Sequence, residues 1–466
     1  MKLQFLLFLC IFLIQIQAFL YLNNTKLGSA SAFNDSPILI HSSVDNVTIP
    51  GVSSPVYSGY LNVNKTNSNS SLFYIFYACP TSNISNLTNF TGYPIIIWLN
   101  GGPGSSSLLG AFYENGPFEL KWNSTSNKIY ESKRAVTWNE NYHMMFVDQP
   151  IGTGGSYAQS AAELTTNQSQ IAQHFYNALQ EFYNLPNFTI FKNTPLFIMG
   201  ESYAGKYVPC IADKILTEND KGGKINIPLT GISIGDGFTD PMTVMAEVGM
   251  FAYNLGLIDY NERITIEQNI LKGLLLAKEG DWQGVTDTFN NNVFGNLQNF
   301  TANVNVYNIQ YYGDYDTSAL DSFLQDNDTS KRYNLKVNYS QQSNAVYNAL
   351  GVDFMQPYTY VVESILNKAK LPILIYNGQD DLIVTSPGTM SWVEKLNWPF
   401  AANFTATNFD LWTDLSQNVI GYKKRVGNLE LRIVNKAGHL VPKDTPNSAI
   451  DMATDFIERC RNETKH

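Results

Sequence analysis

Residues 195–205 read Pro-Leu-Phe-Ile-Met-Gly-Glu-Ser-Tyr-Ala-Gly, and this stretch decides the fold. A short apolar run, 195–199, is followed by a turn that contains Ser202, and a segment of helical period, 204–216, comes next. The residues two before and two after the serine, Gly200 and Ala204, are small, which lets the backbone bend sharply and expose the hydroxyl. The pattern predicts a strand–turn–helix with Ser202 as a nucleophile; the alternative is a serine that only caps the helix.

Other short apolar runs recur along the chain, at 94–99, 143–147, 229–234, 372–376 and 429–434. Continuous apolar runs of this length are typical of strands buried on both faces of a parallel sheet. Segments of helical period at 168–183 and 445–460 alternate with these runs. Two alternating runs near the start, 57–63 and 72–77, indicate an opening antiparallel hairpin. The sequence therefore predicts an α/β fold, with a mostly parallel central sheet flanked by helices.

Residues 242–344 interrupt this alternation. They contain a helical part, 264–278, and then polar, aromatic and Asn-rich sequence. We interpret them as an inserted cap or lid. The core would then consist of residues 19–241 and 345–466.

The histidines narrow the choice of a general base. The chain has five of them, and only His439 and the terminal His466 follow Ser202. In hydrolases with a nucleophile at such a turn, the chain order is serine, then the acid, then histidine. Because His439 lies in a loop after the run 429–434, we expect it to be the base.

Two further strand ends carry polar turns that suit this chemistry. Asp380 and Asp381 follow the run 372–376, and either could orient the imidazole. A glycine-rich turn, 100–107, follows the run 94–99 and could supply a backbone N–H to an oxyanion hole, with the N–H after the nucleophile as the other donor. A phosphate-binding loop is the alternative, but the turn lacks the spacing that such loops need.

Blocks spaced along the chain resemble the signature blocks of the serine carboxypeptidases. They lie at 98–107, 114–118, 200–205, 234–241, 376–381 and 437–442. Residues 376–379 are most similar to the vitellogenic-like carboxypeptidase branch. The resemblance implies an α/β-hydrolase fold with a cap. It also implies removal of single C-terminal residues from peptides and proteins through an acyl-enzyme, without a metal or cofactor.

The resemblance also implies a role for each residue of a Ser-His-Asp triad and its oxyanion hole. Ser202 would be the nucleophile, His439 the base, and Asp381, the second of the adjacent pair, the acid. The backbone amides of Gly102 and Tyr203 align with the oxyanion hole.

A further group aligns with the family's receptor for the substrate's C-terminal carboxylate: Asn100, Gly101, Glu114 and Glu201. Two neighbouring carboxyls cannot both ionise easily, so one proton stays between them. A protonated Glu114/Glu201 pair could donate a hydrogen bond to the substrate carboxylate. We therefore expect better peptide binding at acidic pH.

Three positions depart from the family pattern. Ser105 stands where the family usually has Cys, so a disulfide to the cap is missing. The sequence leaves open how the cap is anchored. Gln379 replaces an acidic residue that is frequent there, and Gly155 replaces the usual Phe. These changes bear on the shape and specificity of the pocket rather than on the triad.

The N-terminus indicates secretion. A cation, Lys2, precedes an apolar run, 3–14, and a small residue, Ala18, which together predict a signal peptide over 1–18 rather than a membrane anchor. N-linked glycans are predicted at N-x-S/T sequons. These begin at Asn23, Asn46, Asn64, Asn69, Asn83, Asn86, Asn89, Asn123, Asn187, Asn299, Asn327, Asn338, Asn403 and Asn462. We expect a protein free of the membrane after cleavage, in the lysosome or vacuole or outside the cell.

The net charge and the spacing of cysteines and histidines argue against other classes of protein. The formal net charge is −10, which disfavours nucleic acid as a partner. No CxxC or HExxH spacing occurs, which argues against a zinc site, and Cys79, Cys210 and Cys460 allow at most one disulfide after signal removal. The remaining rivals are an acyltransferase on the same scaffold, a protective or binding glycoprotein, and a general lipase or esterase. The sequence leaves a homodimer open.

Overall fold

The computed structural model describes residues 40–63, 70–81, 87–222, 224–368 and 371–463. The predicted signal peptide, 1–18, and the terminal His466 lie outside these residues. So do five of the predicted glycosylation sites: Asn23, Asn64, Asn69, Asn83 and Asn86.

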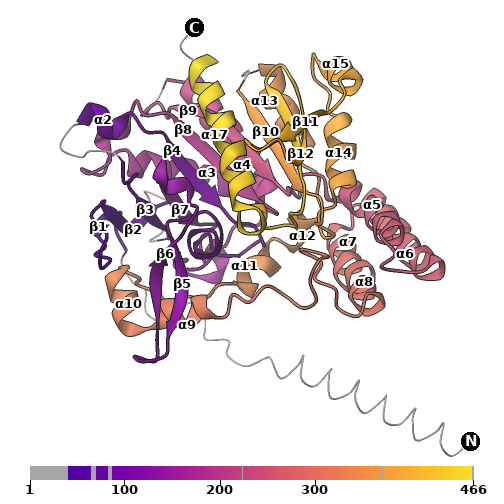
Figure 1. The fold of residues 1–466 in the computed structure, drawn as a ribbon, viewed down its shortest axis with the longest axis horizontal. Coiled ribbons are helices and arrows are strands. Elements are labelled where there is room, and N and C mark those ends of the chain that lie inside the picture. Colours follow the sequence, from indigo (N-terminus) through magenta and orange to yellow (C-terminus); the bar gives the residue numbers. More distant parts are fainter. Residues whose placement is uncertain (1–39, 64–69, 82–86, 223, 369–370, 464–466) are drawn as a thin grey trace, which may run out of the picture. The chain divides into compact units, whose positions relative to one another are not determined.

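One sheet of eleven strands runs through the described residues (Figure 1). In spatial order its strands are β1 (Asp45–Asn46), β2 (Val56–Asn62), β3 (Ser71–Tyr77), β7 (His143–Asp148), β4 (Ile95–Leu99), β8 (Leu196–Glu201), β9 (Leu229–Gly235), β10 (Ile373–Gly378), β13 (Leu429–Val434), β12 (Val419–Val426) and β11 (Asp410–Thr413).

The centre of the sheet, from β7 to β13, is parallel throughout. Every residue of β4, β7, β8, β10 and β13 is buried, as expected for strands covered on both faces. All the apolar runs that were predicted as strands are strands of this centre. The carboxyl ends of the parallel strands meet at one edge of the sheet, where ligands bind in open α/β folds.

Antiparallel strands complete both sides. The predicted opening hairpin is present as β2 and β3, and β12 and β11 extend the other side. A separate hairpin of β5 (Phe118–Asn123) and β6 (Lys128–Lys133) was not predicted. Its strands are mostly exposed and strongly polar, so they carry no apolar run that would have marked them.

Helices α3 (Gln168–Phe182), α4 (Ala204–Asp220) and α17 (Pro446–Glu463) match the predicted helical segments. Helix α4 packs on β8 and β9, and α3 packs against α4. Helix α17 crosses in front of the strands in Figure 1. There the ring of its Phe456 lies 6.0 Å from that of Phe197 in β8. These contacts bury the apolar faces of the helices against the sheet.

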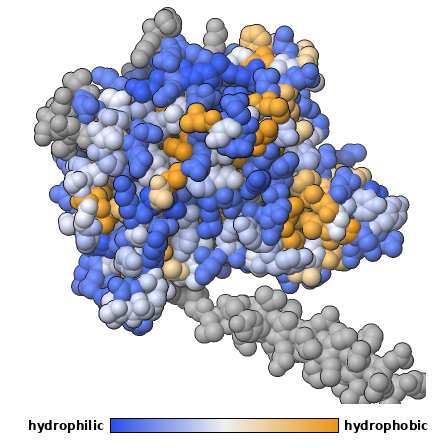
Figure 2. All heavy atoms as spheres, viewed as in Figure 1, coloured by the Kyte–Doolittle hydropathy of each residue, from blue (hydrophilic) through white to orange (hydrophobic). Residues whose placement is uncertain are grey.

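Between β9 and β10 the chain is helical. The helices are α5 (Pro241–Asn254), α6 (Tyr260–Glu279), α7 (Trp282–Thr288), α8 (Gly295–Phe300), α9 (Ala319–Gln325), α10 (Asn327–Arg332), α11 (Asn344–Ala349), α12 (Gly351–Phe354) and α13 (Thr359–Lys368). The predicted helix 264–278 is the main part of α6, which starts at a capping box formed by Asp259 and Glu262. Leu271 and Leu275 of α6 are exposed. Figure 2 shows a hydrophobic area on the side of the molecule where α5 and α6 lie. Over the described residues, we find no helix with the length and hydropathy needed to cross a membrane.

Hydrogen bonds join the glycine-rich turn, which contains Ser105, to residues 341–343. The hydroxyl of Ser105 donates to Oε1 of Gln342 at 2.6 Å. Nε2 of Gln342 donates to the carbonyl of Pro103 at 2.9 Å, and the N–H of Ser343 donates to the carbonyl of Gly104 at 2.9 Å. Residues 342 and 343 are thus joined to the turn that contains Ser105 by polar contacts.

The second departure, Gly155, has a packing reason. A Cβ atom at this position would lie 2.6 Å from Cδ2 of Leu335 and 2.9 Å from the ring of Phe73. These two side chains fill the space that a larger residue would need. Gly155 therefore belongs to the packing behind the glycine-rich turn, where its N–H donates to Asp148 at 2.7 Å.

Candidate active site

The predicted turn after β8 is present, and Ser202 stands at its apex. Strand β8 ends at Glu201, helix α4 begins at Ala204, and Ser202 between them has a φ of 62°. A positive φ is uncommon outside glycine and marks a sharply bent backbone. The small neighbour Gly200 is required, because a Cβ there would lie 2.5 Å from the carbonyl oxygen of Leu99.

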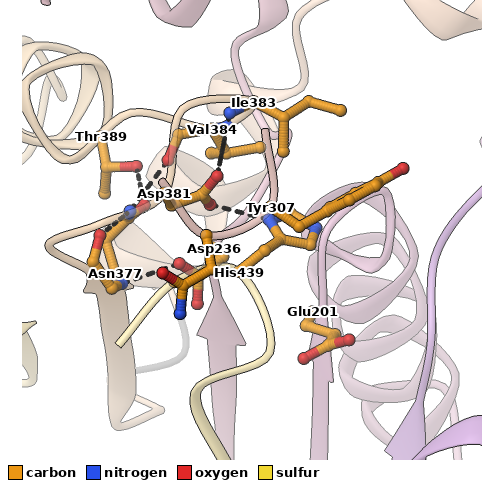
Figure 3. Close-up of polar contacts among 12 residues, drawn as sticks. Glu201, Asp236, Tyr307, Asn377, Asp381, Ile383, Val384, Thr389 and His439 are labelled. Carbon is orange, nitrogen blue, oxygen red and sulfur yellow. Dashed lines mark hydrogen bonds and ion pairs between the residues drawn. The ribbon is translucent and has the colours of Figure 1, made fainter. Parts of the chain in front are cut away.

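His439 and Asp381 form a buried pair (Figure 3). Nδ1 of His439 donates to Oδ2 of Asp381 at 2.7 Å. The other carboxylate oxygen of Asp381 accepts the backbone N–H groups of Ile383 and Val384 at 2.9 and 3.0 Å. The structure thus chooses between the adjacent aspartates: Asp381 contacts the imidazole, whereas Asp380 is only half-buried and bonds to Gln310.

The far side of the His439 ring faces the cavity that Ser202 also lines. Its Nε2 has no hydrogen-bond partner among the described residues. Tyr307 positions this residue in two ways. Its backbone carbonyl accepts the backbone N–H of His439 at 2.6 Å, and its ring centroid lies 5.3 Å from that of the imidazole. Tyr307 was not predicted as a site residue, because only the fold brings residues 305–309 over this loop.

His143, by contrast, is a core residue. Its Nδ1 accepts the N–H of Cys79 at 3.1 Å, and its Nε2 lies 2.8 Å from the carbonyl of Phe90. Burial lowers the pKa of His143 to about 4. Both ring nitrogens are occupied by the backbone, so this imidazole has no free atom for chemistry.

The glycine-rich turn lies directly against the serine turn. A Cβ on Gly101 would lie 2.4 Å from the backbone N of Tyr203, so only glycine allows this approach. Gly102 has a φ of 103°, which also favours glycine. Behind the turn, the buried Asp148 accepts hydrogen bonds from the Ser106 hydroxyl at 2.6 Å and from a backbone amide, and burial raises its pKa to about 6.

Glu114 and Glu201 form a buried carboxyl pair next to this turn. Nδ2 of Asn100 donates to Oε1 of Glu114 at 2.9 Å and to Oε1 of Glu201 at 3.0 Å. Burial raises the pKa of Glu114, and burial together with the charge of Glu114 raises the pKa of Glu201 well above its usual range. The two raised values favour a proton that stays on the pair.

A single cavity of about 580 Å³ collects most of the predicted site residues. Those that line it are Asn100, Gly101, Gly102, Glu201, Ser202, Tyr203 and His439. Glu114 and Asp381 do not line the cavity. Glu114 interacts with Glu201, and Asp381 is hydrogen-bonded to His439, and both of these partners line it. Part of the wall near Ser202 is aromatic, with Tyr203, Phe238, Phe289 and Phe354, and the part formed by 314–321 carries Asp314, Asp316 and Asp321.

A buried network that was not predicted from the sequence supports the aromatic wall. The carboxylate of Asp353 accepts hydrogen bonds from the hydroxyl of Tyr203, from Nε2 of Gln168 at 2.8 Å and from the hydroxyl of Tyr358 at 2.5 Å. The ring of Tyr203 is stacked on that of Phe354 with 5.7 Å between centroids. The network therefore fixes the residue that follows Ser202.

Lys206 completes this network from the first turn of α4. Its side chain is fully buried, and Nζ donates to the carbonyls of Asp353 and Phe354 at 2.7 and 2.6 Å. Nζ also lies 4.0 Å from the Asp353 carboxylate. The only sequence signal for this pair is a lysine four residues after Ser202 on an otherwise apolar helix face, and nothing local points to its partner.

Asp236, at the end of β9, is close to both Asp381 and His439. One donor atom from each of the three lies within 4.8 Å of the others, which makes this the one group of such side chains among the described residues that is compact enough for a metal ion. The Asp381 and His439 atoms are already bonded to each other and to backbone amides. We therefore describe the group as a hydrogen-bonded cluster.

Comparison with known proteins agrees with this geometry. The family model for serine carboxypeptidases matches residues 47–459. The chain belongs to the serine carboxypeptidase family. Within the family, it is 34% identical over 412 residues to serine carboxypeptidase-like 50 of Arabidopsis thaliana, with 88% of each chain covered.

Other members of the family are similarly related. A venom serine carboxypeptidase of Apis mellifera is 32% identical and covers 86% of this chain and 84% of its own. The vitellogenic carboxypeptidase of Aedes aegypti is 32% identical, with 86% and 83% covered, which agrees with the resemblance to that branch. Among solved structures, the prohormone-processing carboxypeptidase of Saccharomyces cerevisiae has a TM-score of 0.77 at 23% identity. It covers 89% of this chain and 95% of its own, and it confirms the predicted α/β-hydrolase fold.

Proposed function

We propose that this serine carboxypeptidase removes single residues from the C-terminus of peptides and proteins at acidic pH, through an acyl-enzyme on Ser202. The observation that carries the proposal is the shared cavity. Ser202 and His439 line it together with Asn100 and Glu201, which belong to a buried, proton-sharing carboxyl pair. A nucleophile beside a receptor for a carboxylate suits a substrate whose last peptide bond lies next to a free C-terminus.

In the first half of the reaction, Oγ of Ser202 forms a bond to the carbonyl carbon of the last peptide bond, and its proton passes to Nε2 of His439. The amides of Gly102 and Tyr203 hold the resulting oxyanion. The C–N bond then breaks, and the departing amino acid takes the proton from His439. Asp381 remains ionised and stabilises the imidazolium through Nδ1.

In the second half, water attacks the ester carbonyl of the acyl-enzyme. His439 removes a proton from the water and returns it to Ser202 as the ester bond breaks. The shortened peptide leaves with a new C-terminal carboxylate. An acceptor amine or alcohol in place of water would make the same intermediate an acyltransferase.

The carboxyl pair accounts for the proposed acidic optimum. While Glu201 holds a proton, it can donate to the substrate carboxylate together with Asn100 and the Gly101 amide. When the pair ionises at higher pH, a negative charge faces that carboxylate and repels it. Binding of a free C-terminus should therefore weaken as pH rises.

We also propose that residues 242–344 form a cap over the site and that the protein is a glycoprotein of the secretory pathway. Phe289, Tyr307 and Asp316 of the proposed cap line the cavity. Every sequon asparagine whose side chain is described is exposed. The buried asparagines, among them Asn100, are not in sequons. This distribution fits glycans at the surface of a lysosomal, vacuolar or extracellular protein.

The deciding experiment is covalent labelling with an organophosphonate, followed by peptide digestion at acidic pH. Label on Ser202 and loss of peptidase activity in Ser202→Ala are expected. Ser318 also lines the cavity, so Ser318→Ala serves as the matched control and should keep both the label and the activity. Retained peptidase activity in Ser202→Ala would refute the mechanism. Products that carry an added acceptor group instead of a free carboxylate would indicate an acyltransferase. Purification in a stable complex, without turnover of any peptide or ester, would indicate a protective or binding glycoprotein.

A further inference from the structure

A second buried aspartate lies behind the Asp381–His439 pair. Asp236 follows β9, is fully buried, and has a φ of 43°. Its Oδ1 accepts the backbone N–H of Gly378 at 2.7 Å. Its Oδ2 receives no hydrogen bond from any N–H or O–H donor of the described residues. A carboxyl oxygen of Asp236 nevertheless lies within 4.8 Å of one of Asp381.

Two neighbouring carboxyls in a buried site share a proton, because two adjacent negative charges without water are too costly. The donors around them decide which one is ionised. Asp381 accepts from three donors: two backbone amides and Nδ1 of His439. Asp236 accepts from one. A carboxylate is stabilised by each hydrogen bond it accepts, so Asp381 is the anion and Asp236 keeps the proton.

We propose that Asp236 is a positioning residue of the triad: it stays a neutral carboxylic acid whose Oδ2–H donates to Asp381 and completes a line from Asp236 through Asp381 and His439 to Ser202. The proposal rests on the proposed role of Ser202 as nucleophile. It adds a residue that touches neither the substrate nor the reacting atoms. Its task is to hold Asp381 in the plane of the imidazole and to satisfy the remaining capacity of the carboxylate to accept a hydrogen bond.

The surroundings of Asp236 favour its neutral form. Asp381 faces it from the loop after β10, and Asp444 contributes negative charge from the end of the short helix α16 (Val441–Asp444). Glu201 and Tyr376 face it from β8 and β10, and His439 from the loop after β13. Only the imidazole in this set can carry a positive charge. Burial and the charge of Asp381 accordingly raise the pKa of Asp236 well above its usual range.

The proposal predicts an alkaline loss of activity that is separate from carboxylate binding. When Asp236 ionises, a second negative charge behind Asp381 repels the Asp381 carboxylate, which disturbs the pair that is proposed to activate Ser202. This effect should appear with any reagent that attacks Ser202. The carboxyl pair Glu114/Glu201, in contrast, should matter only for substrates with a free carboxylate.

The test is the rate at which an uncharged organophosphonate ester labels Ser202, measured across pH in the wild type, Asp236→Asn and Asp236→Leu. Asparagine keeps both bonds without titrating, because its amide oxygen can accept from Gly378 and its NH₂ can donate to Asp381. Leucine keeps the bulk but offers neither bond. Thermal unfolding of each variant reports whether it folds.

We expect Asp236→Asn to label within about threefold of the wild type at its optimum and to lose the alkaline decline. We expect Asp236→Leu to label about 10- to 100-fold more slowly, the usual cost of removing a residue that orients an active-site ligand. If Asp236→Leu does not fold, the labelling rate of Asp236→Asn alone decides whether the proposal holds. A loss of 10-fold or more in a folded Asp236→Asn would overturn the proposal, because it would mean that the anionic form is needed.

Two further results would also overturn it. One is an unchanged alkaline decline in Asp236→Asn. The other is a labelling rate of the wild type that falls on dialysis against a chelator and returns with a divalent metal, which would make the three side chains ligands. Because labelling needs no peptide turnover, it also separates this proposal from the proposed function. Normal labelling without peptidase activity would contradict the substrate assignment and leave the role of Asp236 standing.

Discussion

The carboxyl groups of Glu114 and Glu201 accept hydrogen bonds from the same amide nitrogen, Nδ2 of Asn100, in the buried wall behind the cavity. The two glutamates come from distant parts of the chain. Glu114 ends a short π-helical turn, Gly110–Glu114, and Glu201 ends β8 directly before Ser202. In the proposed function, the protonation of this pair controls binding of the substrate's carboxylate.

The first prediction concerns the pH dependence of peptide binding. KM for a peptide with a free C-terminus should rise by about 10-fold or more as pH increases through the raised pKa of the pair, because one unpaired charge in a buried site costs well over 1 kcal/mol. In Glu201→Gln this rise should flatten, since the amide cannot ionise. The same peptide with an amidated C-terminus is the control substrate. If its KM rose in parallel with that of the free peptide, the pair would not be the carboxylate receptor.

The second prediction concerns folding stability. The folded-state pKa of Glu201 lies above the unfolded value, so the native state binds more protons than the unfolded chain between these two pKa values. The contribution of Glu201 to the free energy of unfolding should therefore be fully present below the unfolded pKa. It should be lost as pH rises through the folded pKa. Each unit of difference corresponds to about 1.4 kcal/mol, so Glu201→Gln should be several degrees more thermostable than the wild type at neutral pH. The gap should close at low pH; a gap of equal size at both pH values would contradict this account.

A third prediction separates the adjacent aspartates. Asp381→Asn should reduce kcat by about 10³- to 10⁴-fold, because the amide cannot stabilise the imidazolium and favours the wrong tautomer of His439. Asp380→Asn, one position earlier, is the matched control and should keep kcat within about threefold, because Asp380 faces Gln310 rather than the imidazole. Steady-state kinetics on one peptide settles the comparison. Similar losses in the two variants would mean that the loop, not the Asp381 carboxylate, is what matters.

A fourth prediction tests the polar tie of the glycine-rich turn. Gln342→Ala removes the bonds to Ser105 and Pro103 and should cost about 1–2 kcal/mol of unfolding free energy. It should also lower kcat/KM, because the turn carries the proposed oxyanion amide of Gly102. Gln356 makes one comparable bond to a carbonyl, at 3.0 Å, and does not itself line the cavity, so Gln356→Ala is the control for loss of such a bond. Denaturant unfolding and kinetics measure both effects; equal kinetics in the two variants would exclude a role in positioning the turn.

The fifth prediction concerns the buried Lys206–Asp353 network. Lys206→Met should destabilise the fold by about 3–5 kcal/mol, because it leaves the Asp353 carboxylate buried without its cation. Adding Asp353→Asn should recover part of this loss, since the double variant has no buried charge. Chemical denaturation of the single and double variants gives the coupling. Strictly additive losses would show that the two side chains do not stabilise each other.

The sequence by itself predicted the local elements and the family. Every apolar run that was predicted as a strand of the central sheet is a strand, because such runs are buried on both faces. The small residues around Ser202 predicted the turn, and the order of residues along the chain made His439 the predicted base. The polar hairpin β5–β6 was missed because it carries no apolar pattern.

Tertiary structure decided what depends on partners distant in the chain. Asp380 and Asp381 are chemically alike in sequence, and only the loop geometry turns one of them toward His439. The proton on the Glu114/Glu201 pair, and the one proposed on Asp236, likewise follow from burial and contact between separate strand ends. A side chain's identity is local, but its protonation state and its hydrogen-bond partners are set by the groups that the fold brings within a few ångströms.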